Sequence, residues 1–326
     1  MMRPLSKASL VLCWLMPAVV HSQWVTSWEP TYLPASHNWA FRQAYPEADR
    51  LFAAFDYGHA ILYERLWTAP EAPVADLDGV QFDYITKTLL VKPPRLPLVE
   101  SAIAPNYVRL VPEAHAMFHW AHLLHRQIYD VLADERLSDA EKDRDVQALL
   151  VFYRSRGPLA FSSQPKGMQL MSGQPYSQAF LRKYQKFNGL IWAYHWLQIG
   201  LYEALLIGHT KSEREAAVAR TVQRFREMVR GAPGSLPSEM PLAPAIAPTF
   251  AKRYPEAAII FDNLHAMHDV ISDVLTNPTV ARKDKRAEIL RAAGRYRDST
   301  TAIVTQAEWW SMAESMGVDA QGGRVR

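Results

Sequence analysis

The chain has 326 residues, with 36 lysines and arginines against 33 acidic residues, and a single cysteine. This near-balance of charge gives no electrostatic reason to expect a nucleic-acid partner or an anionic surface. Because the only cysteine, Cys13, lies in the N-terminal segment, disulfides, thiolate metal ligands and cysteine nucleophiles are excluded from the rest of the chain. The remaining residues, about 300, are enough to bury a large core.

Residues 1–22 have the pattern of a signal peptide. Arg3 and Lys7 precede an apolar run at residues 8–20, which is too short to span a bilayer, and small residues follow at a suitable cleavage point. An anchor that is never cut is the alternative. We expect the mature protein to be periplasmic or secreted.

A repeat dominates the rest of the sequence. Residues 102–132 and 245–275 align without a gap at an offset of 143, and 14 of the 31 positions are identical. The repeat predicts a duplication, with pseudo-repeats at about 40–135 and 177–277.

Four long helices are expected, at residues 46–67, 112–133, 177–207 and 255–276. Three of them begin with Pro-Glu-Ala, which places proline at a first helical position and an acid in the first turn, as helix N-termini favour. The apolar stretch 188–207 is long enough for a transmembrane helix. Its polar residues would be costly at membrane depth, so a buried bundle helix is the better interpretation and no membrane span is expected in the mature chain.

Each long helix carries the same polar triplet, in which the second residue follows the first by three positions and the third follows the second by five. The triplets are Asp56, His59 and Glu64; His122, His125 and Asp130; His195, Gln198 and Glu203; and His265, His268 and Asp273. Tyrosine precedes the third residue in three of the four helices, at Tyr63, Tyr129 and Tyr202.

The remaining segments connect and cover these helices in a single all-α domain over residues 23–316. Residues 69–110 are expected to form an irregular crossover with one short strand near residues 80–90. Further helices are expected at 138–155, 212–230, 283–298 and 303–316, with loops at 157–175 and 232–248. We expect residues 317–326 to be a flexible tail.

Helix geometry directs the first two triplet positions to one face, because a spacing of three residues leaves them about 60° apart. Six imidazoles and a carboxylate in a core cost desolvation unless something pairs or coordinates them. We therefore predict a metal site, with two ions, formed by the first two positions of each triplet: Asp56, His59, His122, His125, His195, Gln198, His265 and His268.

The third position of each triplet points toward a neighbouring helix. Glu64, Asp130, Glu203 and Asp273 are accordingly expected to orient histidines from outside the ligand set, or to form simple hydrogen bonds between helices. His115 and His119 lie on the face of His122, where they would line an access path or be polar bundle residues, and we favour the second interpretation.

This layout resembles ferritin-like dinuclear metalloproteins, in which two helix hairpins joined by a long crossover supply ligands from all four helices. The chain departs from that family where Glu-x2-His pairs are replaced by His122/His125 and His265/His268. Six imidazoles resemble, in ligand type only, the paired coppers of tyrosinase-like and hemocyanin-like proteins. Iron or copper is the expected metal, and zinc and manganese stay open.

The expected function is that of a metal-dependent oxidoreductase that activates dioxygen or peroxide, on a small-molecule substrate that the sequence does not identify. Two alternatives are a non-catalytic metal or haem protein and a structural bundle without metal. Haem is the weaker cofactor expectation, since no Cys-x2-Cys-His attachment motif occurs. The sequence does not determine the oligomeric state.

Overall fold

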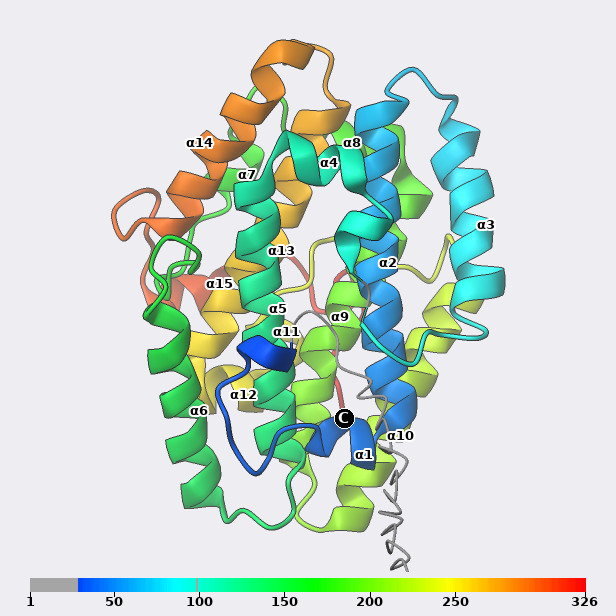
Figure 1. Ribbon diagram of the computed structural model, residues 1–326. Helices are drawn as coiled ribbons and strands as arrows, with labels where there is room; N and C mark the ends of the chain where they lie inside the picture. The colour runs from blue at the N-terminus through cyan, green and yellow to red at the C-terminus, as the bar shows by residue number, and fades with distance from the viewer. Residues whose placement is uncertain (1–28, 98) are drawn as a thin grey trace, which may run out of the picture.

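The computed structural model describes residues 29–97 and 99–326, and this part of the chain is all-α (Figure 1). Lys166 and Ile303 form one isolated bridge, and the described residues contain no β-strand. The expected signal peptide lies outside the described residues. Among the helices that are described, none combines the length and the apolar character needed to cross a membrane.

Four long helices form the centre of the fold: α2 (Pro46–Thr68), α5 (Pro112–Ala133), α9 (Gln185–Ile207) and α13 (Pro255–Thr276). In Figure 1, α2 and α13 run upward and α5 and α9 run downward. Each of α2 and α5 contacts both α9 and α13, so the two halves of the chain interlock in one bundle.

A short helix precedes each long helix. These are α1 (Ala40–Ala44), α4 (Pro105–Leu110), α8 (Ala179–Lys183) and α12 (Pro248–Arg253). One residue separates each pair, and its backbone is nearly the same in all four: φ −129° and ψ 60° at Tyr45, −142° and 68° at Val111, −129° and 59° at Tyr184, and −127° and 59° at Tyr254. The continuous helix expected over 177–207 is therefore wrong. The backbone of Tyr184 is not helical, and the amides of Lys186 and Phe187 bond the Asp78 carboxylate instead of the preceding turn.

Four outer helices cover the bundle: α6 (Asp139–Arg154) on α5, α14 (Lys285–Arg297) on α13, α10 (Lys211–Arg230) on α9, and α15 (Gln306–Ser315) on the short helix α11 (Ala243–Ile246). Ser138 and Glu141 form a capping box at the start of α6. Two buried lysines, also 143 positions apart, have matching roles. Lys142 donates to the carbonyl of Leu132 at 2.8 Å, and Lys285 donates to that of Leu275 at 3.0 Å. The duplication stays an inference from the repeat, and these lysines add a structural parallel to it.

The crossover between α2 and α5 is more regular than expected. The strand expected near residues 80–90 is wrong, because residues 76–89 form helical turns: η2 (Asp76–Gln81), α3 (Phe82–Tyr84) and η3 (Ile85–Leu89). The buried residues Leu77, Phe82, Ile85 and Leu89 recur at helical rather than alternating intervals. Short helical turns also occur at η1 (Glu29–Thr31), η4 (Glu100–Ala102), α7 (Gln169–Ser172) and η5 (Arg282–Asp284).

The C-terminal segment 317–326 packs onto the bundle, so the expected flexible tail is also wrong. The side chain of Gln321 is fully buried, accepts a hydrogen bond from the Leu242 amide at 2.9 Å and donates one to the Ala313 carbonyl at 2.7 Å. Gly322 has φ +100°, and a Cβ there would lie 2.8 Å from the Trp196 ring. Close packing holds this end of the chain.

Candidate metal centre

All eight predicted ligand residues lie inside the bundle. The exposed fraction of these residues is between 0% and 6%, which is low for histidine, aspartate and glutamine. The prediction that the first two triplet positions face the interior is confirmed. Because these groups are polar, their placement has to be explained by what they bind.

Four of the eight form a layer of histidines with one ring from each long helix: His59, His122, His195 and His268. We call this the four-histidine layer. The ring centroids of His59 and His268 are 4.3 Å apart, and that of His195 is 5.5 and 5.4 Å from them. The ring of His122 is 5.7 Å from that of His268. Antiparallel helix directions explain why α5 and α9 contribute their first triplet position and α2 and α13 their second.

The other four lie one helical turn away and form a mixed layer: Asp56, His125, Gln198 and His265. The rings of His125 and His265 are 6.2 Å apart, and Nε2 of His265 lies 3.1 Å from Oε1 of Gln198. The layers are in contact, because the His195 and His265 rings stack at 4.1 Å.

In three of these imidazoles, hydrogen bonds indicate which nitrogen carries the proton. The other nitrogen of each neutral ring is then unprotonated, and we call it bare. His59 Nδ1 donates to the Phe55 carbonyl at 3.4 Å, which leaves Nε2 unprotonated. His265 Nε2 donates to the amide oxygen of Gln198, which leaves Nδ1 unprotonated. Tyr202 donates to the His125 carbonyl at 2.9 Å and accepts from His125 Nδ1 at 2.6 Å, which leaves Nε2 of His125 unprotonated.

These bare nitrogens are the atoms that suit a metal ion. Nε2 of His59, Nε2 of His125 and Nδ1 of His265 are buried without a hydrogen-bond partner in the structure. Burial lowers the pKa of His59 and of His265 to about 3, so both rings are neutral at pH 7. A neutral imidazole nitrogen with a free lone pair is a metal ligand, and a second nitrogen that donates elsewhere fixes its orientation.

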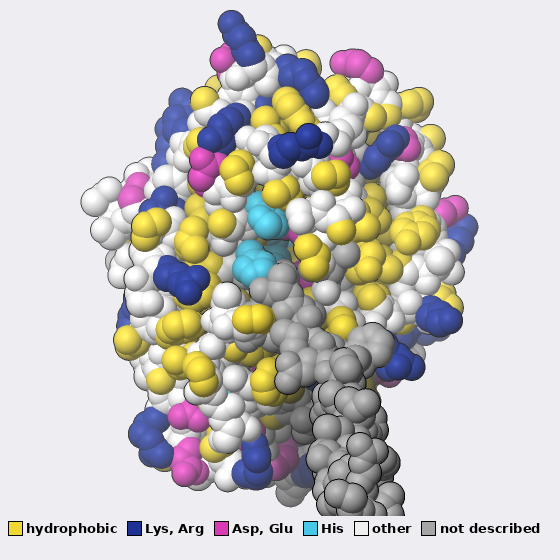
Figure 2. Space-filling model, in the orientation of Figure 1, with side chains coloured by type: hydrophobic (Ala, Val, Ile, Leu, Met, Phe, Trp, Pro, Cys, Tyr) yellow, Lys and Arg dark blue, Asp and Glu magenta, His cyan; other side chains and the backbone are white. Residues whose placement is uncertain are grey.

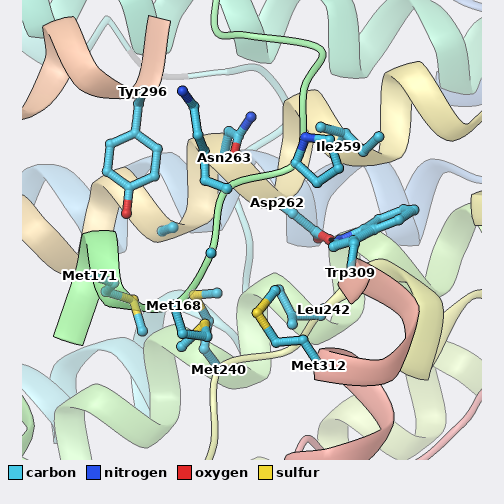
Figure 3. Close-up of a pocket in the computed structure, with 14 residues that line it drawn as sticks. Met168, Met171, Met240, Leu242, Ile259, Asp262, Asn263, Tyr296, Trp309 and Met312 are labelled. Carbon is cyan, nitrogen blue, oxygen red and sulfur yellow. Dashed lines mark hydrogen bonds between the residues drawn. The ribbon is translucent and has the colours of Figure 1, made fainter. Parts of the chain in front are cut away.

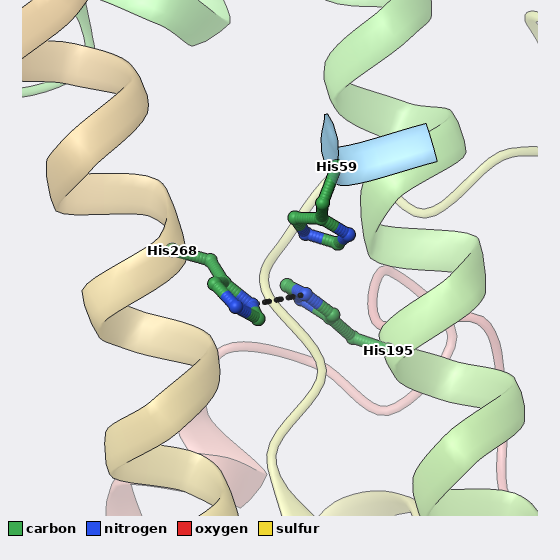
Figure 4. A group of neighbouring side chains, drawn as sticks. All are labelled: His59, His195 and His268. Atoms are coloured by element: carbon green, nitrogen blue, oxygen red, sulfur yellow. Dashed lines mark hydrogen bonds between the residues drawn. The ribbon is translucent and has the colours of Figure 1, made fainter. Parts of the chain in front are cut away.

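The tightest group is His59, His195 and His268, which converge from α2, α9 and α13 (Figure 4). Their ligand nitrogens all lie within 4.8 Å of one another. Nδ1 of His268 and Nε2 of His195 are 3.3 Å apart. Two imidazole nitrogens bound to one tetrahedral zinc at 2.0–2.1 Å are themselves separated by about 3.3 Å. This triad could therefore hold a metal ion with small ring rotations.

Asp56 is only partly available as a ligand. Arg126, a buried arginine that the sequence analysis did not single out, donates to its Oδ2 at 3.1 Å. The other oxygen of Asp56 is buried without a hydrogen-bond partner and lies 3.8 Å from Nδ1 of His122. Burial raises the pKa of Asp56 to about 7, and the nearby Arg126 guanidinium opposes that rise. The only feature of the sequence that marks Arg126 as a neighbour of the site is its position directly after His125.

The four third-position acids do not orient histidines, and this expectation is corrected. Each accepts hydrogen bonds from backbone amides at the start of a short helix. The alternative expectation, that these acids form simple hydrogen bonds between helices, is the one observed. Glu64 caps α4, Asp130 caps α1, Glu203 caps α12 and Asp273 caps α8. A carboxylate at a helix N-terminus satisfies free amides and interacts well with the helix dipole.

The recurring tyrosines connect each triplet to another helix. Tyr63 donates to the His268 carbonyl at 3.3 Å, Tyr202 donates to the His125 carbonyl at 2.9 Å, and Tyr129 donates to the Gln198 carbonyl. All three acceptors belong to second-position residues. Ser272 of α13 occupies the equivalent position and bonds within its own helix at the His268 carbonyl. The tyrosines therefore fix the backbone beneath the candidate ligands.

His115 and His119, which are outside the triplets, lie nearer the surface than the triplet histidines. His115 and His119 are half-buried, and Nε2 of His115 lies 3.2 Å from a Glu100 carboxylate oxygen. Histidine side chains are visible in a hollow of the face drawn in Figure 2. Neither His115 nor His119 belongs to the convergent triad.

No protein-family model, curated protein or solved structure matches this chain. The resemblance to ferritin-like proteins thus stays a hypothesis based on helix layout, and the function has to be inferred from the chemistry of the site.

Proposed function

We propose that this chain is a transition-metal protein whose two layers of buried side chains bind two ions, and that the centre carries out redox chemistry with dioxygen or peroxide. The observation that carries the proposal is the convergence of the buried residues His59, His195 and His268, whose ligand nitrogens lie within 4.8 Å of one another. Iron and copper both accept imidazole ligands and both react with dioxygen. Export of the protein belongs to the proposal as well.

The scarcity of carboxylates favours copper over a carboxylate-bridged iron pair. Asp56 is the one carboxylate among the eight candidates, and one of its oxygens is already held by Arg126. Haem fits poorly, because rings from four helices pack with centroids 4.1 to 6.3 Å apart, which leaves no slot for a macrocycle.

Non-catalytic metal binding, for storage or electron transfer, is the second candidate. The observation that favours it is burial: His125, His195 and His265 are 0% exposed, so a bulky substrate cannot approach them. A diatomic molecule or an electron can reach a buried centre, whereas a large organic substrate needs an open cavity.

The test is elemental analysis of the full-length protein after purification and again after reconstitution with Cu²⁺, Fe²⁺, Zn²⁺ or Mn²⁺. We expect about two ions per chain for the preferred metal, one for each layer. His59→Gln with His268→Gln should remove one ion, and His125→Gln with His265→Gln should remove the other. The absorption spectrum under dioxygen and under peroxide separates a reactive centre from a storage site.

His37→Gln is the matched control, because His37 is also buried but pairs with Asp145 outside the bundle core. It should keep the full metal content. A wild-type protein that retains none of the four metals after dialysis, at micromolar concentration, would overturn the proposal. A metal content that is the same in both double variants as in the wild type would overturn the assignment to these layers.

A further inference from the structure

A second polar region lies beside α9 and α13, in a cavity of about 100 Å³ that the metal proposal does not use. Its rim is exposed and includes Ser172, Gln178 and Glu239. Its floor is buried and includes Asn188, Trp192, Asp269 and Asp273. This volume is below that of sites for drug-sized ligands, about 300–1,000 Å³, so the cavity suits a small ligand.

Asn188 is the residue that points to a ligand. This residue is 3% exposed and lines the cavity, and its amide nitrogen Nδ2 has no hydrogen-bond partner in the structure. A buried N–H without an acceptor is destabilising, because it has lost its hydrogen bonds to water. A ligand that presents an acceptor oxygen to Asn188 would recover that cost.

The acidic lining favours a cation over an anion. Glu239, Asp269 and Asp273 line the cavity, and its lining contains no lysine or arginine. Burial raises the pKa of Asp269 to about 8, and a positive charge beside its carboxyl group would favour the ionised form. Asp273 already accepts from the Gln178 and Phe180 amides, so Asp269 and Glu239 are the acids open to a ligand. Asp269 Oδ2 accepts a hydrogen bond from the Trp192 indole at 2.9 Å, which fixes the carboxyl group and leaves its other oxygen for a ligand. The Trp192 ring also lines the cavity, and aromatic faces attract organic cations.

The remaining walls are apolar. Met168, Met171 and Met240 line this cavity and also the neighbouring one in Figure 3, where they share the wall with Met312. Thioether side chains adapt their shape and make favourable contacts with aromatic rings. A ligand with a hydrophobic body and a charged end matches the walls and the floor together.

We propose that this cavity binds a small organic ammonium ion that also carries a hydroxyl group, of the amino-alcohol class. The ammonium group lies at Asp269 and Glu239, the hydroxyl oxygen accepts from Asn188, and the hydrophobic part contacts Trp192 and the methionines. The site stands on its own residues and does not depend on the metal centre.

Calorimetry with four matched probes tests the proposal on metal-free full-length protein. 2-Amino-1-phenylethanol carries both groups, 2-phenylethylamine lacks the hydroxyl, 1-phenylethane-1,2-diol lacks the charge, and mandelate carries the opposite charge. We expect the amino alcohol to bind best, the diol to bind about tenfold more weakly and mandelate not to bind, since unpaired buried charge is costly.

Three variants assign the contacts. Asp269→Asn keeps the shape and should weaken binding of the amino alcohol about tenfold, and Glu239→Gln at the exposed rim should weaken it about twofold to threefold. Asn188→Leu should abolish the preference for the amino alcohol over 2-phenylethylamine. The matched control is Asp262→Asn, because Asp262 is also a buried acid of α13 that accepts an indole N–H, from Trp309 at 2.8 Å, but lines the neighbouring cavity (Figure 3).

Circular dichroism and thermal unfolding of each variant establish that it is folded. If Asp269→Asn does not fold, Glu239→Gln and the probe series still decide the question. Equal binding of the diol and the amino alcohol, binding of mandelate, or saturation by Ca²⁺ in place of the amine would overturn the proposal. Metal analysis of the same samples keeps a failure here distinct from a failure of the metal centre.

Discussion

Polar side chains at equivalent triplet positions make different contacts, because the residues packed against them differ. The first triplet position holds Asp56 in α2, where Arg126 donates to it, and His195 in α9, where the rings of His265 and His268 lie close by. The third position is more uniform, since all four acids meet backbone amides. A residue's role is therefore set by the group placed against it, and a shared spacing alone does not determine it.

Glu203 offers a test of the capping role. Its carboxylate accepts from the Thr249 amide at 2.9 Å and the Phe250 amide at 3.1 Å. We expect Glu203→Gln to lower the free energy of unfolding by about 1 kcal/mol, because one charged cap is lost. Urea unfolding measures the loss, and the metal content should not change.

Glu215→Gln on the exposed face of α10 serves as its control and should alter stability by less than about 0.5 kcal/mol. A Glu203→Gln protein of wild-type stability that lost its metal would instead restore the earlier interpretation, in which this acid orients a histidine.

At the scale of elements, the two helices of each half cap one another. An acid of α2 holds the start of α4, which leads into α5, and an acid of α5 holds the start of α1, which leads into α2. The same exchange joins α9 and α13 through α12 and α8. Each short helix thus fixes where the next long helix begins. The position of that helix's triplet along the bundle axis is fixed in the same way.

The C-terminal segment is a second such element, and Gln321 is its anchor. Gln321→Ala should lower the free energy of unfolding by about 2 kcal/mol, because the Leu242 amide and the Ala313 carbonyl both lose a buried partner. The midpoint of urea unfolding reports the change. Gln223→Ala, at an exposed position of α10, should have almost no effect. Wild-type stability of Gln321→Ala would mean that the segment is not held as the structure places it.

For the molecule as a whole, the buried imidazoles make the stability of the metal-free protein depend on pH. The pKa of His59 and of His265 is about 3 in the folded state, because burial disfavours the charged ring, and about 6.5 when the chain unfolds. The unfolded state thus binds more protons between these values. The stabilising contribution is complete above pH 6.5 and is lost as the pH falls toward 3.

We expect the free energy of unfolding of the metal-free protein to fall by about 3 kcal/mol per pH unit from these two residues alone, well below pH 6.5. Urea unfolding between pH 7.5 and 5 measures the slope. The double variant His59→Gln with His265→Gln should reduce the slope by about that amount. An unchanged slope would show that the two rings are already charged in the folded state.

Several features follow from the sequence because their causes are local. The bounds of α5 and α13 match the expected 112–133 and 255–276, since proline at a first helical position and a continuous apolar period are readable in a short window. The inward placement of the paired polar positions also follows, because a spacing of three residues on a helix fixes their common face.

Other features were decided by partners far away in the chain. Glu203 meets an amide 46 positions later, Arg126 meets a carboxylate 70 positions earlier, and Gln321 binds residue 242 across 79 positions. Similarly, the direction in which each helix crosses the bundle decides which triplet member joins the four-histidine layer. The sequence by itself determined the helices and their polar faces, through local periodicity, while only the tertiary structure decided which of those groups meet.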